Sequence, residues 1–275
     1  MNGNDEPDAT PTPAQETTIP ENPVDKNKKE YIEPYYPTRH GHGDLIILGQ
    51  KSMNEHDNQA EDIKKLSQLS EFLGAELINW TGKSSKEIME AFKEFSTDKK
   101  REGKDFIIVF ILSEAKHLNH IRGAAREDNK DDYYKLDDVL HDMAYGEGTK
   151  VLGIPKIFFV QNVASKGTDN ISGGHQDDTK STLCHRMADF FVSFNKEYDE
   201  CKIDKTRFGS TYINLLDSEI RNAVKQGWGL FTTMTIVNRK LAEEYKNSQQ
   251  KTMNQAPRFH SMLRYDFKFK AKNEN

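Results

Sequence analysis

Two loops of the predicted fold carry the polar side chains from which an active site could be built. They follow two of the most apolar runs of the chain, Phe106 to Ser113 and Ile157 to Gln161. In an open α/β sheet, ligands bind beyond the carboxyl ends of the strands, so catalytic groups are expected at these two places. The residues there are Ser113, Glu114, Ala115, His117 and His120 in the first loop, and Gln161, Asn162, Val163, Ala164 and Ser165 in the second. Neither loop contains a cysteine, so this edge offers no thiolate nucleophile.

Nucleophiles elsewhere in the chain are weakly supported. Ser113 and Ser165 have no adjacent base, which a serine nucleophile needs. Cys201 could be a displaced nucleophile, but no histidine lies near it in the sequence, and a free thiol is the favoured interpretation. An atypical hydrolase with a relocated nucleophile stays open as an alternative.

Metal chemistry is also weakly signalled. His117 and His120 could ligate a metal or act as a base, but two histidines without a third ligand do not define a site. A group of acids has the composition of a calcium loop without the spacing of an EF-hand; its members are Asp128, Asp131, Asp132, Asp137 and Asp138. We interpret them as a solvated loop and a negatively charged helix start. No metal and no cofactor are expected.

The elements that must position these loops alternate between strand and helix. Short apolar runs predict strands at 45–48, 75–80, 106–113, 157–161, 189–194 and 259–269, with helical patterns between most of them. Ser84 and Glu87 resemble a capping box ahead of one helix. This alternation favours a twisted, mostly parallel central sheet of about six strands, flanked by helices on both faces. The predicted fold class is α/β.

Composition excludes several classes of protein. Residues 1–30 hold five of the nine prolines and few apolar side chains, so we expect a disordered N-terminal pro-segment. The 44 acidic and 39 basic residues give a net charge of −5, which argues against a nucleic-acid partner. The longest apolar run, Phe106 to Leu112, is far shorter than the roughly 20 residues of a membrane span, so no membrane association is expected. Two cysteines suit a reducing compartment, and we expect a cytoplasmic protein.

Several segments resemble the caspase family of cysteine proteases, and the likeness runs over nearly all of residues 31–269. IFFVQNVAS is similar to the strand that ends in the family's QACxG nucleophile signature, and FILSEA to the strand that ends in its Ser-His-Gly. MADFFVSF resembles the first strand of the small subunit, and FGSTYI, IVNRKLAEEY and FHSMLRYDFKF lie where the family has GSWFI, its VNRKV helix and its last strand. The resemblance implies a caspase-like fold with a large-subunit-like part at 31–165, an intersubunit linker loop at 166–182 and a small-subunit-like part at 183–275.

The resemblance places degenerate residues at the catalytic positions. Glu114 matches the family's histidine, and Val163, 49 residues further on, matches its cysteine, close to the family's spacing of about 50. The mechanism needs a thiolate to attack the scissile carbonyl and an imidazole to manage the proton, and these residues supply neither. Ala115 stands for the glycine whose N–H contributes to the oxyanion hole. The resemblance therefore implies a pseudocaspase and not an enzyme.

Substrate recognition is degraded in the same comparison. The family holds an aspartate side chain with two arginines and a glutamine, of which Gln161 survives, while His56 aligns with the first arginine. The segment with the second arginine is absent, and neither Lys202 nor Arg207 can be assigned its role from spacing. Candidate sites for cleavage by another caspase remain in the tail and in the glycine-rich loop: Asp25, Asp169, Asp177 and Asp178.

The implied function is regulatory. A dead caspase fold can pair with an active caspase, or with a second copy of itself, and so modulate apoptosis; a decoy for caspase inhibitors or substrates is a variant of this hypothesis. In the family the last strand meets its twin across a two-fold axis. We therefore expect a dimer seam on the strand at 259–269, with partner-facing side chains at His260, Met262, Arg264 and Asp266.

Overall fold

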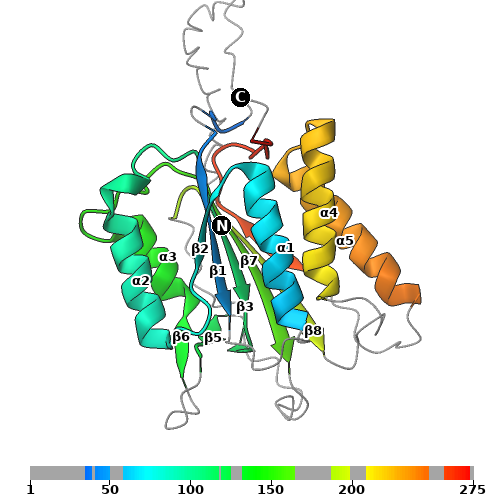
Figure 1. Cartoon of the computed structure of the whole chain (residues 1–275), viewed down its shortest axis with the longest axis horizontal. Coiled ribbons are helices and arrows are strands. Elements are labelled where there is room, and N and C mark those ends of the chain that lie inside the picture. The colour runs from blue at the N-terminus through cyan, green and yellow to red at the C-terminus, as the bar shows by residue number, and fades with distance from the viewer. Residues whose placement is uncertain are drawn as a thin grey trace, which may run out of the picture. The chain divides into compact units, whose positions relative to one another are not determined.

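The computed structural model describes residues 35–38, 41–49, 58–117, 119–124, 132–164, 187–198, 209–247 and 257–272. Within them the core is a six-stranded sheet in the order β2–β1–β3–β7–β8–β9 (Figure 1). All neighbouring strands pair in parallel except β9, which is antiparallel to β8. The strands are β1 (Gly43–Gly49), β2 (Glu76–Asn79), β3 (Phe106–Leu112), β7 (Lys156–Ala164), β8 (Phe190–Tyr198) and β9 (Arg258–Ser261). The predicted α/β class and the mostly parallel sheet of six strands are confirmed.

Helices cover both faces of this sheet (Figure 1). One face carries α1 (Asn58–Leu73), α4 (Thr211–Gln226) and α5 (Leu230–Asn247), and the other carries α2 (Ser85–Thr97) and α3 (Leu136–Tyr145). Successive side chains of a strand point to opposite faces, so each strand feeds two cores. In β3, Phe110 packs in the core under α1 and Val109 in the core under α2. All seven residues of β3 are buried, which explains its uninterrupted apolar sequence.

Local sequence signals set several helix ends. The Ser84 side chain accepts a hydrogen bond from the Glu87 N–H, and the Glu87 carboxylate accepts from the Ser84 N–H at 2.8 Å, so the predicted capping box is confirmed. α4 starts after Ser210, whose side chain accepts from the Ile213 N–H. It ends at Gly227, which has a φ of 68°, a left-handed conformation that glycine adopts without strain. None of the helices in the described ranges is long and apolar enough to cross a bilayer.

A small antiparallel sheet was not predicted. It consists of β4 (Ala115–His117), β5 (His120–Arg122) and β6 (Tyr133–Lys135), with β5 in the middle. Strands of three residues carry too few alternating side chains to reveal a period of two, so the sequence pattern does not signal them. The sheet follows β3 after only Ser113 and Glu114, which places it beside the carboxyl end of β3.

The last strand is shorter than predicted. β9 ends at Ser261, and the expectation of a strand reaching Phe269 is wrong. Beyond Ser261 the chain leaves the regular strand, and Arg264 Nε binds Asp189 of the same chain at 2.8 Å. The expected alternation is largely retained, because Phe267 and Phe269 are buried and Phe259 and Leu263 pack against the core. Tyr265, which the pattern also places on the apolar face, is the exception and is 39% exposed.

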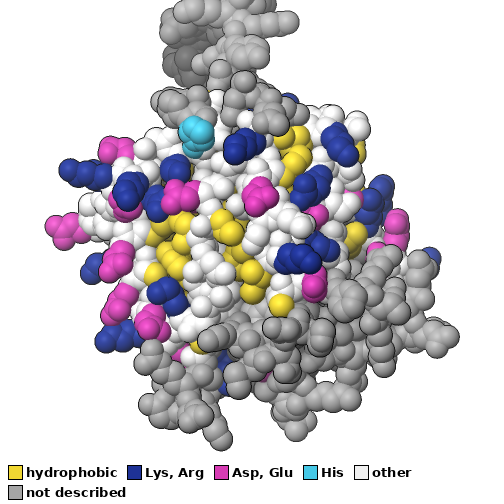
Figure 2. Space-filling model, in the orientation of Figure 1, with side chains coloured by type: hydrophobic (Ala, Val, Ile, Leu, Met, Phe, Trp, Pro, Cys, Tyr) yellow, Lys and Arg dark blue, Asp and Glu magenta, His cyan; other side chains and the backbone are white. Residues whose placement is uncertain are grey.

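Charges of both signs are mixed on the surface. Figure 2 shows lysine and arginine side chains interspersed with aspartate and glutamate over one face, with apolar patches between them. The mixture agrees with the net charge of −5. The described part of this face therefore presents no extended region of a single sign.

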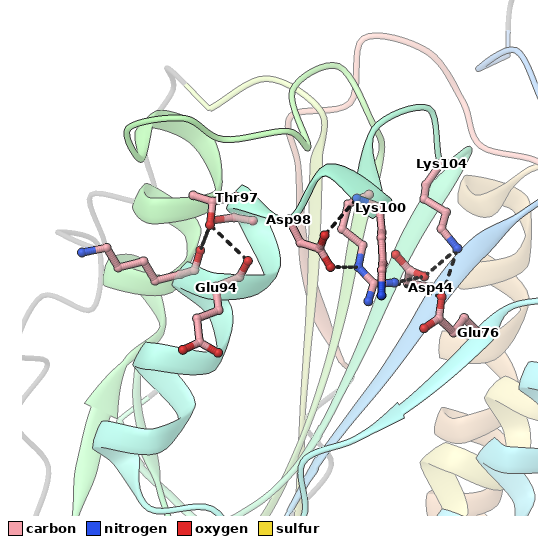
Figure 3. Close-up of polar contacts among 10 residues, drawn as sticks. Asp44, Glu76, Glu94, Thr97, Asp98, Lys100 and Lys104 are labelled. Atoms are coloured by element: carbon pink, nitrogen blue, oxygen red, sulfur yellow. Dashed lines mark hydrogen bonds and ion pairs between the residues drawn. The ribbon is translucent and has the colours of Figure 1, made fainter.

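Charged side chains tie the amino ends of β1 and β2 together (Figure 3). The buried carboxylate of Asp44 lies 2.9 Å from Arg101 Nη1 and 3.1 Å from Lys104 Nζ. Glu76 binds the same two cations at 3.0 and 3.3 Å, but its side chain is 55% exposed. Burial raises the pKa of the Asp44 carboxyl, although both cations oppose the rise. For Glu76, partial burial is outweighed by Arg101 and Lys104, which hold its pKa below the ordinary value.

The two carboxylates should differ in their effect on stability. Asp44→Ala should lower the free energy of unfolding by about 3 kcal/mol, because it leaves poorly solvated cations without their buried partner. Glu76→Ala should cost less than about 1 kcal/mol, since an exposed ion pair is screened by water. Urea unfolding of both variants measures the difference. Equal losses would contradict the assignment of Asp44 as the central member of this cluster.

Candidate functional site

The carboxyl ends of β3 and β7 form one edge of the sheet, and there the two predicted loops meet. The strands are adjacent and parallel, and Leu112 pairs with Gln161 in their register. Just beyond this pair, the Ser113 N–H donates to the Gln161 carbonyl oxygen at 3.2 Å. The chain segments that carry Glu114 and Asn162 are thereby brought together, as expected for loops that follow neighbouring parallel strands.

Glu114 is held in an ion pair. Its Oε2 lies 2.5 Å from Arg122 Nη1, and the Glu114 and Arg122 side chains are only 15% and 26% exposed. The backbones are joined as well, because the Arg122 N–H donates to the Glu114 carbonyl oxygen at 2.8 Å. The Ser113 hydroxyl donates to the Arg122 carbonyl oxygen at 2.6 Å. The Glu114 carboxylate is therefore engaged with the Arg122 guanidinium, and the Ser113 hydroxyl is engaged with the backbone.

Asn162 binds the backbone of Ala115 with both ends of its carboxamide. Its Oδ1 accepts from the Ala115 N–H at 2.9 Å, and its Nδ2 donates to the Ala115 carbonyl oxygen at 3.3 Å. Only one orientation of the amide satisfies both groups, because the N–H needs an acceptor and the carbonyl needs a donor. This contact joins β7 to β4 across the edge.

Gln161 is buried in the sheet beside a second amide. Its side-chain Oε1 accepts from Asn195 Nδ2 at 2.8 Å, and the two residues are register partners on β7 and β8. Gln161 is 1% and Asn195 2% exposed. The neighbouring strand therefore orients the Gln161 carboxamide. A part for Gln161 in holding a substrate stays a prediction.

Other predicted residues are placed by the backbone or fall outside the described ranges. Val163 lies within β7, in register with Glu197 of β8, so the strand continues through this position. His117 of β4 and His120 of β5 are register partners. The residues that lie outside the described part of the chain are Asp25, His56, Asp128, Asp131, Ser165, Asp169, Asp177, Asp178, Cys201, Lys202 and Arg207.

Two described members of the acidic group, Asp132 and Asp137, bind groups of the protein. Asp132 accepts hydrogen bonds from the N–H and the hydroxyl of Ser85. Asp137 accepts from Asn119 Nδ2 at 2.7 Å, and burial raises its pKa. Across the described residues, no group of three or more histidine, cysteine, aspartate or glutamate side chains is arranged to hold a metal ion.

Arg122 and Asn195 belong to this edge and were not predicted. Arg122 meets Glu114 only because β4 and β5 form a hairpin, and no periodic pattern signals that hairpin. Asn195 directly follows the strand predicted at 189–194, so the pattern places it at the correct end of the sheet. Its contact with Gln161 depends on the register between two parallel strands, which the sequence does not specify.

Comparison with known proteins identifies the family. A family model described as the Caspase domain matches residues 45–268. The chain belongs to the caspase family. Caspase-1 of Spodoptera frugiperda is 26% identical over 262 residues, which cover 90% of this chain and 82% of that protein. Caspase-1 of Drosophila melanogaster is 28% identical over 174 residues, covering 58% of this chain and 50% of that protein.

Solved structures agree on the fold. A structure of pro-Sf-caspase-1 superposes with a TM-score of 0.67 at 23% identity and covers 90% of this chain and all of that one (100%). The crystal structure of caspase-1 from Spodoptera frugiperda has a TM-score of 0.66 at 23% identity, covering 94% of this chain and 100% of its own. The caspase-like fold expected from the sequence is confirmed.

β9 is the outermost strand on one side of the six-stranded sheet. Within the described residues, no further strand pairs with the outer side of β9. Arg258, His260 and Ser261 are exposed there, whereas Phe259 stacks on Phe191 with ring centroids 5.2 Å apart. His260 is thus an exposed residue of an edge strand, in the position predicted for it.

The other residues predicted to face a partner lie beyond the end of β9 and contact their own chain. Met262 is partly buried against the core under α2 and α3. The Arg264 guanidinium donates twice to Asp189 at 2.8 Å. The Asp266 carbonyl oxygen accepts from the Tyr36 N–H at 3.0 Å. Their placement on one continuous strand is wrong, and contact with a partner stays a prediction for all of them.

A buried lysine lies behind this edge. Asp189, 3% exposed, accepts from the Tyr36 hydroxyl at 2.7 Å. Lys156, 1% exposed, donates from Nζ to the Ile154 carbonyl oxygen at 2.9 Å and lies 4.7 Å from the centroid of the Phe190 ring. Burial lowers the pKa of Lys156 to about 8, against the opposing attraction of Asp189.

Lys156 should make stability depend on pH. Its pKa is about 8 in the folded chain, against an ordinary value of 10.5. Burial of the charged amine therefore destabilises the fold fully below pH 8, and this cost falls as the pH rises toward 10.5. The difference in unfolding free energy between wild type and Lys156→Met should therefore shift in favour of wild type by up to roughly 3 kcal/mol across this window. Lys86→Met, at an exposed position of α2, is the control in the same urea titrations. A difference that is constant from pH 7 to 10.5 would contradict this.

Proposed function

We propose that this chain is a catalytically inactive caspase homologue that regulates apoptosis by dimerising with an active caspase. The observation that carries the proposal is the ion pair of Glu114 with Arg122, at the position matched to the family's histidine. Val163 stands at the position matched to the cysteine. A neutralised carboxylate and an aliphatic side chain replace the base and the thiolate that the reaction needs.

The catalytic deficit is large on energetic grounds. Loss of cooperating catalytic groups costs up to about a millionfold in kcat, roughly 8 kcal/mol of transition-state stabilisation. Loss of the nucleophile alone accounts for most of this decrease in kcat, because losing the base as well has little further effect once no attacking atom is present. Residual polar groups of the edge are bound to the chain itself, as described for Ser113 and Gln161.

The exposed β9 edge supports the pairing half of the proposal. An edge strand presents unpaired N–H and C=O groups and is a template for another chain. A two-fold axis would set β9 against the equivalent strand of an active caspase, or of a second copy of this chain. We expect the complex in the cytoplasm, where partner abundance decides between the two pairings.

The first expected outcome is an absence of proteolysis. Purified chain at micromolar concentration should release no fluorophore from a panel of aspartyl peptides, before or after the linker at 166–182 is cut by an added protease. The physical reason is the missing nucleophile and base. Fluorescence over several hours measures it, with an active caspase as the positive control. Turnover that Cys201→Ala abolishes would establish the relocated nucleophile instead.

A gain-of-function pair tests the same point from the other side. Glu114→His combined with Val163→Cys should restore at most weak cleavage, because the arginines of the aspartate pocket are still missing and Arg122 loses its partner. Val163→Cys alone is the matched control and should be slower still. Near-normal caspase rates in the double variant would show that the pocket assignment, with His56 at the first arginine, is wrong.

The second expected outcome concerns the β9 edge. Arg258→Glu with His260→Asp alters exposed positions of this strand and should reduce co-purification with an active caspase by at least about tenfold, equivalent to 1.4 kcal/mol. The matched control is Lys86→Glu with His141→Asp on α2 and α3, whose side chains are 85% and 64% exposed. Binding that falls equally in both variants, or in neither, would rule out β9 as the seam.

A further inference from the structure

β4 is an edge strand, and the outward backbone groups of its first residue, Ala115, are already bound. In the small sheet the order is β4–β5–β6, so among the described residues β4 has a strand neighbour on one side only. The Glu114 carbonyl oxygen points toward β5, where it accepts from the Arg122 N–H at 2.8 Å. Because the C=O and the N–H of one trans peptide group point in opposite directions, the N–H of Ala115 points away from β5, toward the end of β7. An extended peptide that added to β4 would use that N–H.

The Asn162 carboxamide fills this place. It accepts from the Ala115 N–H at 2.9 Å and donates to the Ala115 carbonyl oxygen at 3.3 Å, and both residues are half-buried. A carboxamide has the same donor and acceptor as a backbone peptide group, so it satisfies the two groups that a docked strand would otherwise satisfy. Alanine, which the family's QACxG signature has at the matching position, has no such group.

We propose that Asn162 is a built-in occupant of the peptide-binding edge, which keeps the backbone of Ala115 from binding the carbonyl oxygen of a peptide. The inference rests on the proposed function, because it adds a second, independent reason why the β3–β7 edge does not process peptides. The missing nucleophile prevents reaction, and Asn162 prevents docking. The site is closed even to a peptide that needs no cleavage.

The Ala115 N–H lies where a donor could bind a ligand. A backbone N–H at the carboxyl edge of β3, next to the end of β7, is placed to donate to a carbonyl oxygen or to an oxyanion in the crevice. A donor that is already bound must first lose its partner. Displacing the Asn162 carboxamide would cost a ligand two hydrogen bonds before it could form its own.

A purely structural role makes the opposite prediction. If the contact only docks β4 onto β7, removing it should loosen the small sheet and give no gain in binding. If Asn162 is an occupant, its removal should open a binding edge even though the fold loses some stability. The sign of the change in peptide binding separates the two roles.

Titration followed by amide NMR tests the proposal on the full chain. The probe is the acetylated peptide amide Ac-ENPVD-NH2, the sequence of residues 21–25, added up to millimolar concentration. In wild type the Ala115 amide should exchange slowly with solvent and should not shift. In Asn162→Ala it should exchange about tenfold faster, the loss expected for one hydrogen bond, and should shift saturably with the peptide. Asn162→Asp loses the donor to the Ala115 carbonyl oxygen but keeps an acceptor for the N–H, so the Ala115 amide should still exchange slowly and should not shift with the peptide.

Two controls keep the outcome decisive. Asn238→Ala removes another side-chain amide, that of a residue on α5, which donates to the Pro257 carbonyl oxygen at 3.3 Å. This variant should leave the exchange and the shift of the Ala115 amide unchanged. Asn162→Ser replaces the alanine variant if the latter does not fold. A folded variant with a fast-exchanging Ala115 amide that ignores the peptide would overturn the proposal, as would equal peptide shifts in wild type. Peptide turnover by wild type would contradict the proposed function and not the role of Asn162, because the titration measures peptide binding at Ala115 and not catalysis.

Discussion

The parallel pairing of β3 with β7, buried on both faces of the sheet, is the constraint on which the rest of the structure depends. A slip of one residue would turn every side chain of a strand to the wrong core, so burial holds the register of Leu112 against Gln161. That register fixes where both strands end. It brings the loop with Glu114 beside the one with Asn162, and the small sheet grows from the same end.

At this edge several polar side chains bind other groups of the chain, although Arg122 Nε and Asn195 Oδ1 are buried without a partner among the described residues. Glu114 is neutralised by Arg122, Gln161 is bound by Asn195, and Asn162 covers the backbone of the residue after Glu114. Catalytic sites keep such groups free or poised for a ligand, because only interactions formed in the transition state speed a reaction. The fold of a caspase is retained here, and these polar groups of the edge bind one another. The surface that we propose for partners is β9, on the other side of β8.

Much of the fold was predictable from sequence because strong patterns are local. The all-apolar run of β3 and the capping box at Ser84 need no tertiary information, and both are confirmed. The three-residue strands β4 to β6 were missed, since they are too short for a period to appear. The end of β9 was predicted too far along the chain, because the alternating apolar residues continue past Ser261 although the strand does not. The contact of Arg264 with Asp189, 75 residues apart, and that of Glu114 with Arg122 across a hairpin carry no signal in the pattern of either segment.

Labelling with a peptide fluoromethyl ketone tests whether this chain has an activated thiol, because the reagent alkylates such a thiol without requiring turnover. The full chain and an active caspase are incubated side by side with the reagent and analysed by intact mass and peptide mapping. We expect no adduct on this chain under conditions that label the active caspase completely, since neither Glu114 nor Val163 supplies a thiolate or its base. One adduct per chain, mapped to Cys201 or Cys184, would contradict it.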